Sequence, residues 1–211
     1  MGLSVRSWSS TCRTTRCALC LVLTSSLVPA TVPAQVRPAE SPETACDRLA
    51  AHPADAQRRG TGVELSDVQM SLALAACNAA VTRVPENPRY RFQYSRALHR
   101  ADRHREEAVN LLSAARQGYA AAIANVGLHS LNGDGPDGIP KDDPTALRWL
   151  QQAADMGNAG ALTALGDMYR DGKGVTRNPA EAAQFYSRAA SADYALGMVR
   201  LADAYLSGTG V

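Results

Sequence analysis

One stretch of the chain decides its fold: Gly157–Ala192, GNAGALTALGDMYRDGKGVTRNPAEAAQFYSRAASA. This stretch of 36 residues is one copy of a unit that also occurs at Gly118–Met156 and, in part, at Asp193–Val211. The first copy has 39 residues, because the extra residues Pro136–Gly138 enlarge its glycine-rich loop. Periods of this length are typical of stacked supersecondary units, none of which buries its apolar face alone.

Each half of the unit predicts an α-helix. In the first half, Ala161, Leu165 and Tyr169 recur at four-residue steps and share one stripe with Gly166. A glycine in a helix costs about 1 kcal/mol relative to alanine, so we expect a neighbouring helix to pack closely against it. The positions that we expect to hold the repeats together are Gly127, Leu165, Gly166, Tyr169, Gly172, Gly174, Trp149 and Phe185.

The glycines and prolines of the unit predict where its helices end and begin. Gly172 suits the left-handed conformation that ends many helices, and Gly174 frees the turn that follows. Asn178 before Pro179 is the cap and first-turn signal of a second helix. Residues 142–144 give the same signal in the preceding unit.

Two half-motifs carry a resemblance to a known family. They are A-L-x-x-L-G-x-M-Y-x-D-G-x-G-V at Ala161–Val175 and A-x-x-F-Y-x-x-A-A at Ala182–Ala190, and they resemble the Sel-one-like repeat (SLR) family of tetratricopeptide-like proteins. The resemblance covers residues 118–211 and implies an all-α fold, a right-handed α-solenoid of antiparallel helix pairs. The last repeat is truncated at Val211, so we expect a fragment of a longer protein, or else a partner or second copy that covers the open face.

The chain before the repeats divides into three parts. Residues 1–34 have the basic start, apolar centre and small-residue end of a secretory signal peptide. The alternative is an uncleaved membrane anchor, although the apolar run is short for a span. Residues 35–62 form a linker and a short helix. Residues 63–117 form a helical segment whose last part, Tyr90–Arg100 and Arg105–Gln117, resembles a tetratricopeptide pair.

Charge and cysteine content fit an exported protein. The formal net charge of +2 comes from the first 34 residues, which hold three arginines and no acids, so nothing attracts the rest of the chain to nucleic acid. Outside the signal, only Cys46 and Cys77 remain, and two cysteines in an exported chain favour one disulfide. A closed loop of about 30 residues is stabilised by about 3–4 kcal/mol. The alternative is a pair of free buried cysteines.

The resemblance implies a binding surface rather than an active site. In tetratricopeptide-like solenoids the first helix of each pair lines the concave side, and its non-core positions face a ligand. The candidate partner-binding residues are therefore Leu128, Leu131, Thr163, Asp167, Arg170, Val199, Asp203 and Leu206. We expect an exported adaptor or scaffold, periplasmic or secreted from a bacterial envelope, that binds an unidentified protein or peptide. We expect neither nucleic acid nor a stable membrane span after signal cleavage.

The sequence predicts no enzyme and no cofactor. It lacks a phosphate-binding glycine loop between strand and helix, a G-x-S-x-G motif and an H-E-x-x-H motif. The alternative function is a cell-envelope hydrolase, such as the β-lactam-hydrolysing proteins linked to this family, or an envelope-polymer-binding protein. It would use the six arginines between Arg89 and Arg105, which we interpret as a solvated helix face with buried aromatic neighbours.

Two polar clusters contain residue types that can bind metals. His99, Asp102 and His104 straddle a predicted turn between helices, and no third strong ligand stands near them in the sequence, so we predict an exposed turn. The acidic loop around Asp137 misses the spacing of a calcium-binding loop. The sequence therefore predicts no metal site.

Overall fold

The computed structural model describes residues 40–52, 59, 62–64 and 69–210, all within one compact unit, Ala39–Val211. The predicted signal peptide and the first part of the linker lie outside the described residues, as do residues 65–68 of the predicted helical segment 63–117. The other predicted helices fall within the described part of the chain.

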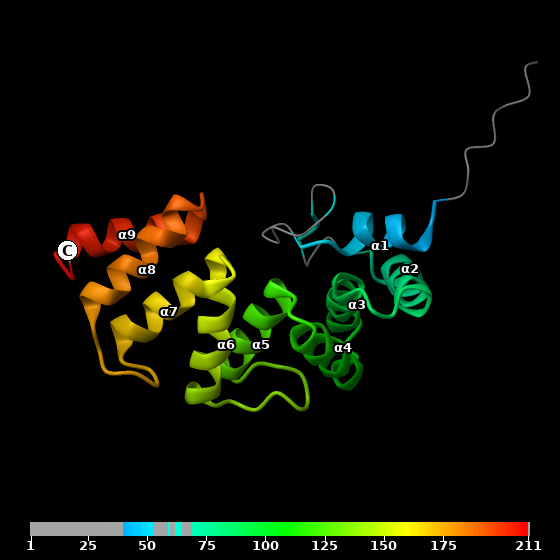
Figure 1. Cartoon of the computed structure of the whole chain (residues 1–211), viewed down its shortest axis with the longest axis horizontal. Coiled ribbons are helices and arrows are strands. Elements are labelled where there is room, and N and C mark those ends of the chain that lie inside the picture. The colour runs from blue at the N-terminus through cyan, green and yellow to red at the C-terminus, as the bar shows by residue number, and fades with distance from the viewer. Residues whose placement is uncertain (1–39, 53–58, 60–61, 65–68, 211) are drawn as a thin grey trace, which may run out of the picture. The chain divides into compact units, whose positions relative to one another are not determined.

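The described residues form helices and no strand, and the helices follow one another in sequence order (Figure 1). They are α1 (Pro42–Ala50), α2 (Met70–Arg83), α3 (Pro88–Arg100), α4 (His104–Arg116), α5 (Ala120–Asn132), α6 (Asp143–Asp155), α7 (Ala159–Asp171), α8 (Pro179–Ser191) and α9 (Ala195–Ser207). The predicted all-α solenoid of helix pairs is confirmed. Within the described residues, none of the helices has both the length and the apolar character that a membrane crossing requires.

Capping residues fix the ends of the repeat helices. The side chain of Asn158 accepts a hydrogen bond from the Ala161 N–H at 2.9 Å, and Asn178 accepts one from the Glu181 N–H at 3.2 Å. Helix α7 ends before Gly172, which takes a left-handed conformation with φ 73°. The predicted helix ends at Gly172 and at Asn178 are therefore confirmed.

Glycines allow the two helices of a pair to approach closely. A Cβ atom added to Gly166 of α7 would lie 2.3 Å from the Tyr186 ring of α8. One added to Gly127 of α5 would lie 2.8 Å from Leu150 of α6. Both glycines lie at the contact between paired helices, which is the close packing that the sequence predicts.

The other repeat positions fill or border the core. Leu165 is completely buried, and the ring of Tyr169 stacks on that of Phe185 with centroids 5.5 Å apart. Trp149, the counterpart of Phe185 in the preceding pair, is half-buried and packs against the same core. Gly174 has φ 66°, so the turn before α8 uses a conformation that favours glycine.

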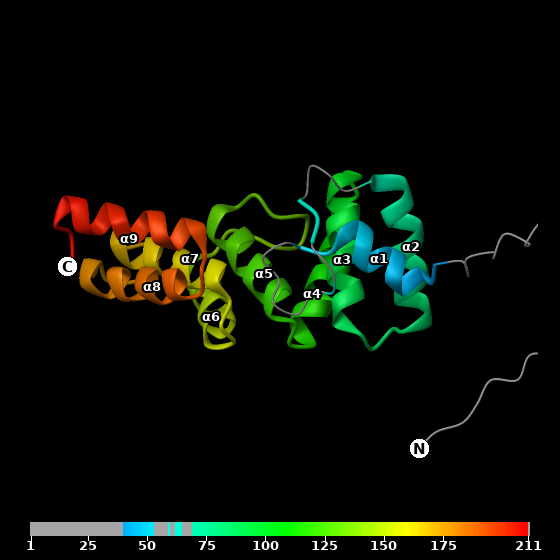
Figure 2. The same ribbon diagram turned by 90° about the horizontal axis from the view of Figure 1, so that it is seen from above.

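The first helices of successive pairs also contact one another. Helix α5 lies against α7, and α7 lies against α9, in addition to the contacts between consecutive helices. Figure 2 shows α7, α8 and α9 stacked at one end of the unit. We call the surface formed by α5, α7 and α9 the first-helix face.

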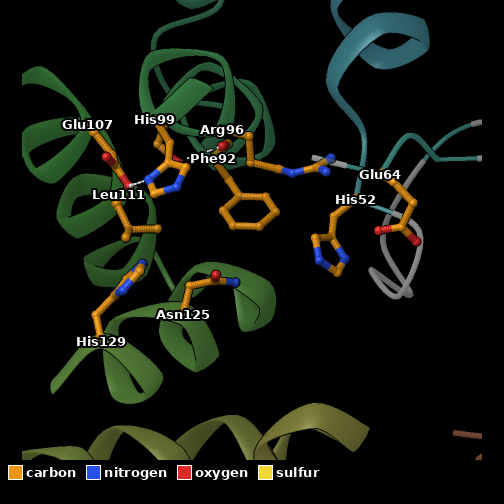
Figure 3. A pocket seen from close by; sticks show the side chains of 10 residues that line it. His52, Glu64, Phe92, Arg96, His99, Glu107, Leu111, Asn125 and His129 are labelled. Carbon is orange, nitrogen blue, oxygen red and sulfur yellow. Dashed lines mark hydrogen bonds and ion pairs between the residues drawn. The ribbon is translucent and has the colours of Figure 1, made fainter. Parts of the chain in front are cut away.

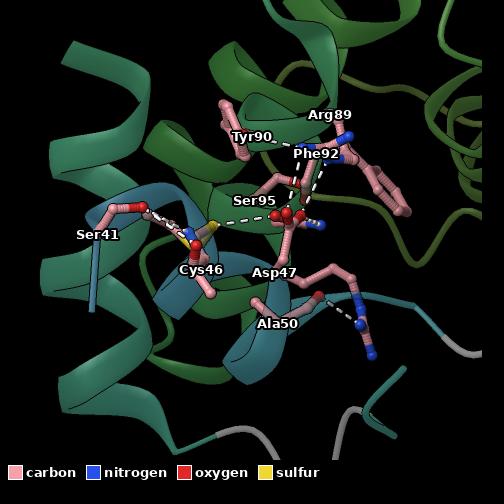
Figure 4. Close-up of a disulfide and its surroundings, with 12 residues drawn as sticks. Ser41, Cys46, Asp47, Ala50, Arg89, Tyr90, Phe92 and Ser95 are labelled. Carbon is pink, nitrogen blue, oxygen red and sulfur yellow. Dashed lines mark hydrogen bonds and ion pairs between the residues drawn. A yellow bond between two sulfur atoms is a disulfide. The ribbon is translucent and has the colours of Figure 1, made fainter. Parts of the chain in front are cut away.

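A disulfide and a buried ion pair fasten the helices that precede the repeats. Cys46 and Cys77 form the predicted disulfide, which joins α1 to α2 (Figure 4). Beside it, the carboxylate of Asp47 accepts hydrogen bonds from Arg89 Nη2 at 3.1 Å and from Gln93 Nε2 at 2.9 Å. All three side chains are buried, so α1 is held on α3 by charge-assisted contacts as well as by apolar packing.

Candidate functional site

A cavity of about 140 Å³ lies between α3, α4, α5 and the segment that follows α1 (Figure 3). Its lining is rich in histidine and includes the apolar side chains of Phe92 and Leu111. The residues that line it are His52, Glu64, Phe92, Ser95, Arg96, His99, Glu107, Leu111, Asn125 and His129. In Figure 3, Phe92 occupies the middle of this group, with His52 on one side and His99 on the other.

Two side chains of α3 shape the cavity. Arg96 donates hydrogen bonds to the backbone oxygen of Ala50 at 2.6 Å and to that of Val63 at 2.5 Å, which holds the segment after α1 against α3. Phe92 is buried, and its ring centroid lies 5.4 Å from that of Tyr119. The buried ring of Phe92 therefore forms an apolar side of the cavity, and the buried guanidinium of Arg96 holds the segment that forms another side.

Glu107 is a buried charged residue of the lining. Its carboxylate is buried, and it lies 3.0 Å from His99 Nδ1 and 3.2 Å from His104 Nδ1. The hydrogen bond to Glu107 raises the pKa of the His104 imidazole, and Asp102, 2.7 Å from Nε2, acts in the same direction. The turn residues Asp102 and His104 are exposed, as predicted, and the turn also brings both histidines to the buried carboxylate of Glu107.

A second polar cluster joins three helices at the far end of the repeats. Asp167 Oδ1 accepts a hydrogen bond from the Tyr186 hydroxyl at 2.8 Å and lies 2.8 Å from Arg170 Nη1. Arg200 Nε of α9 lies 3.1 Å from the same oxygen, as an ion pair whose angle does not suit a hydrogen bond. Burial and the Asp167 carboxylate raise the pKa of Tyr186. A cavity of about 100 Å³ adjoins the cluster, bordered by Arg170, Tyr186 and Arg200.

Seven of the eight candidate partner-binding residues fall into three groups. Val199, Asp203 and Leu206 are exposed on α9, whereas Leu128 and Leu131 are half-buried and pack against the core. Asp167 and Arg170 are half-buried within the cluster around the Tyr186 hydroxyl.

Thr163 does not face a partner, contrary to prediction. It is buried, and its hydroxyl donates to the Ala159 backbone oxygen at 3.0 Å. Helix α7 contacts α5, α6, α8 and α9, so positions beside its main apolar stripe are covered as well.

The interpretation of the arginine-rich segment needs a correction. Its aromatic residues are buried as expected, but Arg89 and Arg96 are buried too, rather than solvated. Arg89 is paired with Asp47, and Arg96 holds two backbone oxygens. These two side chains are therefore committed to internal contacts and do not form part of a polymer-binding surface.

Several residues of the cavity have no clear signal in the sequence. Glu107 follows Arg105 and Glu106 at the start of a helix and looks like part of a solvated charged face. The one available signal was its spacing of three residues from His104, which places both on one side of α4. His52 and His129 reach the cavity from separate elements, and no local pattern links them.

Comparison with known proteins identifies the repeats. The Sel1 repeat family model matches residues 120–158, 159–194 and 195–211. Residues 120–211 are Sel1-like repeats that form a solenoid of helix pairs. The three matches have the same period as the units found in the sequence, and each match begins two residues after the start of the corresponding unit.

Two solved structures resemble this Sel1-like solenoid. A protective antigen present in uropathogenic Escherichia coli strains, which displays an SLR fold, is 29% identical with a TM-score of 0.59. The alignment covers 69% of this chain and 31% of that one. A Sel1 repeat protein from Oxalobacter formigenes is 24% identical with a TM-score of 0.59, over 66% of this chain and 56% of that one. The chain thus spans about a third and about half of their lengths. No curated protein matches it.

Proposed function

We propose that this Sel1-like protein is an exported, non-catalytic adaptor that binds a protein segment along its first-helix face. Sel1-like repeats build helical scaffolds for protein interaction, and stacked repeats present extended surfaces to their partners. The observation that carries the proposal is the exposed side of α9. There, Val199, Asp203 and Leu206 are spaced by four and three residues, so they form one stripe.

The side chains of this stripe indicate the chemical character of the segment that would bind there. Val199 is 54% exposed and Leu206 is 88% exposed, so both apolar side chains are available for contact with another molecule. Asp203 lies between them and is exposed as well. The stripe has one apolar side chain on each side of a carboxylate. A partner segment with one apolar residue on each side of a lysine or arginine would complement it in shape and charge.

Export is supported by the disulfide. Cys46 and Cys77 are buried and bonded between α1 and α2, and such bonds persist in oxidising compartments. The predicted signal peptide at residues 1–34 agrees with this location. Fusing those residues to a reporter enzyme that needs its own disulfides tests export: an active reporter supports it, and an inactive reporter in the cytosol contradicts it.

Binding is tested with a matched pair of substitutions. Leu206→Glu alters the stripe on α9, and Val109→Glu makes the same change at a 66% exposed position of the second helix α4. Both variants are compared with the unchanged protein in capture from envelope extract, with quantitative mass spectrometry. A partner kept by Val109→Glu and lost by Leu206→Glu supports the proposal. A partner that Leu206→Glu retains fully places the binding surface elsewhere.

A further inference from the structure

The turn between α3 and α4 gathers two histidines and a carboxylate at one wall of the histidine-rich cavity. One ligand atom from each of His99, His104 and Glu107 lies within 4.8 Å of the others. Imidazole nitrogen and carboxylate oxygen are ligands that zinc and related transition metals take in proteins. The three residues come from outside the first-helix face, so an assignment here is independent of the proposed adaptor function.

The local fold produces this cluster. His104 and Glu107 are three residues apart on α4, so they lie on the same side of that helix. Asp102 takes a left-handed conformation with φ 59°, in the short turn between α3 and α4. That turn brings His99, near the end of α3, to the other oxygen of the Glu107 carboxylate. The three groups therefore converge through backbone geometry rather than through chance proximity on a charged surface.

Two of the three separations are close to those of metal ligands, and the third is at most 4.8 Å. Two atoms bound to a tetrahedral zinc ion at its usual bond lengths lie about 3.3 Å apart. The Glu107 oxygens lie 3.0 Å from His99 Nδ1 and 3.2 Å from His104 Nδ1. The two imidazoles have 37% and 44% of their side-chain surface exposed, so they can rotate toward a shared ion and leave positions open to water.

A second carboxylate orients one of the histidines. While Nδ1 of His104 faces Glu107, its Nε2 lies 2.7 Å from Asp102 Oδ1. Metal-binding histidines usually donate their other ring N–H to such a carboxylate, which fixes the ring. The nearby Arg103 does not oppose a cation at this place, because its guanidinium is paired with Glu106 at 2.7 Å.

The burial of the Glu107 carboxylate also favours a bound cation. Its side chain is only 4% exposed, and a buried carboxylate needs a compensating charge or hydrogen bonds. Among the described residues, the side-chain partners of this carboxylate are His99 and His104. We propose that His99, His104 and Glu107 bind a divalent transition-metal ion, and that Zn²⁺ is the ion whose ligands and geometry they match best.

The test measures Zn²⁺ binding to the full chain, expressed without a polyhistidine tag and stripped of metal. Titration against a chromophoric zinc chelator near neutral pH gives stoichiometry and affinity. We expect one ion per chain and at least about a tenfold loss of affinity in His104→Gln, since even outer-shell changes at metal sites have effects of that size. The control is His129→Gln, a cavity histidine that pairs with Asp134 instead, and its affinity should equal that of the unchanged protein.

Thermal unfolding provides a second measurement that does not depend on the chelator. A bound ion raises the melting temperature of the unchanged protein and of His129→Gln, and this increase is smaller or absent in His104→Gln. Circular dichroism before metal addition shows that His104→Gln is folded. The proposal is overturned if the unchanged protein binds no Zn²⁺, or if His104→Gln binds it as tightly as the control does.

Discussion

The contact between Gly166 and Tyr186 gives the sharpest test of how the helix pairs are built. In Gly166→Ala, the new methyl carbon would lie 2.3 Å from Tyr186 Cε1 and 2.6 Å from Cδ1. Carbon atoms in good contact are about 3.5–4.0 Å apart, so the helices or the ring must move by more than about 1 Å. The ring is 2% exposed, and its hydroxyl is bonded to Asp167, so it has no free direction in which to move.

The expected destabilisation is the sum of three effects. Overpacking a core costs about 1–3 kcal/mol, and loss of a hydrogen bond to a charged group costs about 1.5–3 kcal/mol. Alanine regains about 1 kcal/mol over glycine in a helix. With middle values, Gly166→Ala lowers the free energy of unfolding by about 3 kcal/mol.

The control is Gly160→Ala on the same helix. There the nearest atoms to a new Cβ are Asn158 Oδ1 at 3.3 Å and Tyr194 Oη at 3.7 Å, both at the ends of side chains. We expect Gly160→Ala to be neutral or to stabilise by up to about 1 kcal/mol. Urea unfolding followed by circular dichroism measures both variants. If Gly166→Ala is as stable as Gly160→Ala, close packing is not the reason for this glycine, and the reasoning fails.

The remaining predictions concern Tyr186, the disulfide and Leu150. Tyr186→Phe should cost about 1.5–3 kcal/mol at neutral pH. Because the pKa of Tyr186 is raised above its ordinary 10.0, the unchanged protein loses stability as pH rises above that value, where the unfolded tyrosine ionises first. Urea unfolding at alkaline pH should show that Tyr186→Phe lacks this loss, and an identical pH dependence in both proteins contradicts it. Replacing Cys46 and Cys77 by serine should lower the unfolding free energy by about 3–4 kcal/mol, and an unchanged melting temperature would mean that the bond does not form. Leu150→Ala, at a fully buried position, should cost about 2–5 kcal/mol in urea unfolding, and a cost below 1 kcal/mol would show that α5 and α6 do not pack as described.

The elements of the fold that depend on local signals could be predicted from the sequence. The glycine after α7 and the Asn178–Pro179 start of α8 each act within a few residues, and the repeat period is visible by comparing copies of the unit; the structure has all three. The disulfide was predictable from the small number of cysteines rather than from geometry. For these features, the sequence alone excludes most other repeat periods, helix boundaries and cysteine pairings.

The candidate site was less predictable, because it depends on contacts between distant residues. Thr163 lies off the main stripe of α7, but neighbouring pairs cover it, which helical periodicity does not reveal. Asp167 looked free to bind a partner, yet its carboxylate meets Tyr186 from the next helix and Arg200 from the one after. Glu107 meets His99 because the turn at Asp102 directs His99 toward it, and no local pattern in the sequence indicates that contact.

Hydrogen-exchange mass spectrometry of the protein with and without its captured partner tests the central claim most directly. That claim is that a stack of helix pairs presents its first helices to another protein. We expect binding to slow exchange in α9 and in exposed parts of α5 and α7, and to leave exchange in α6 and α8 unchanged. Protection confined to α6 and α8, with none on α9, would contradict it.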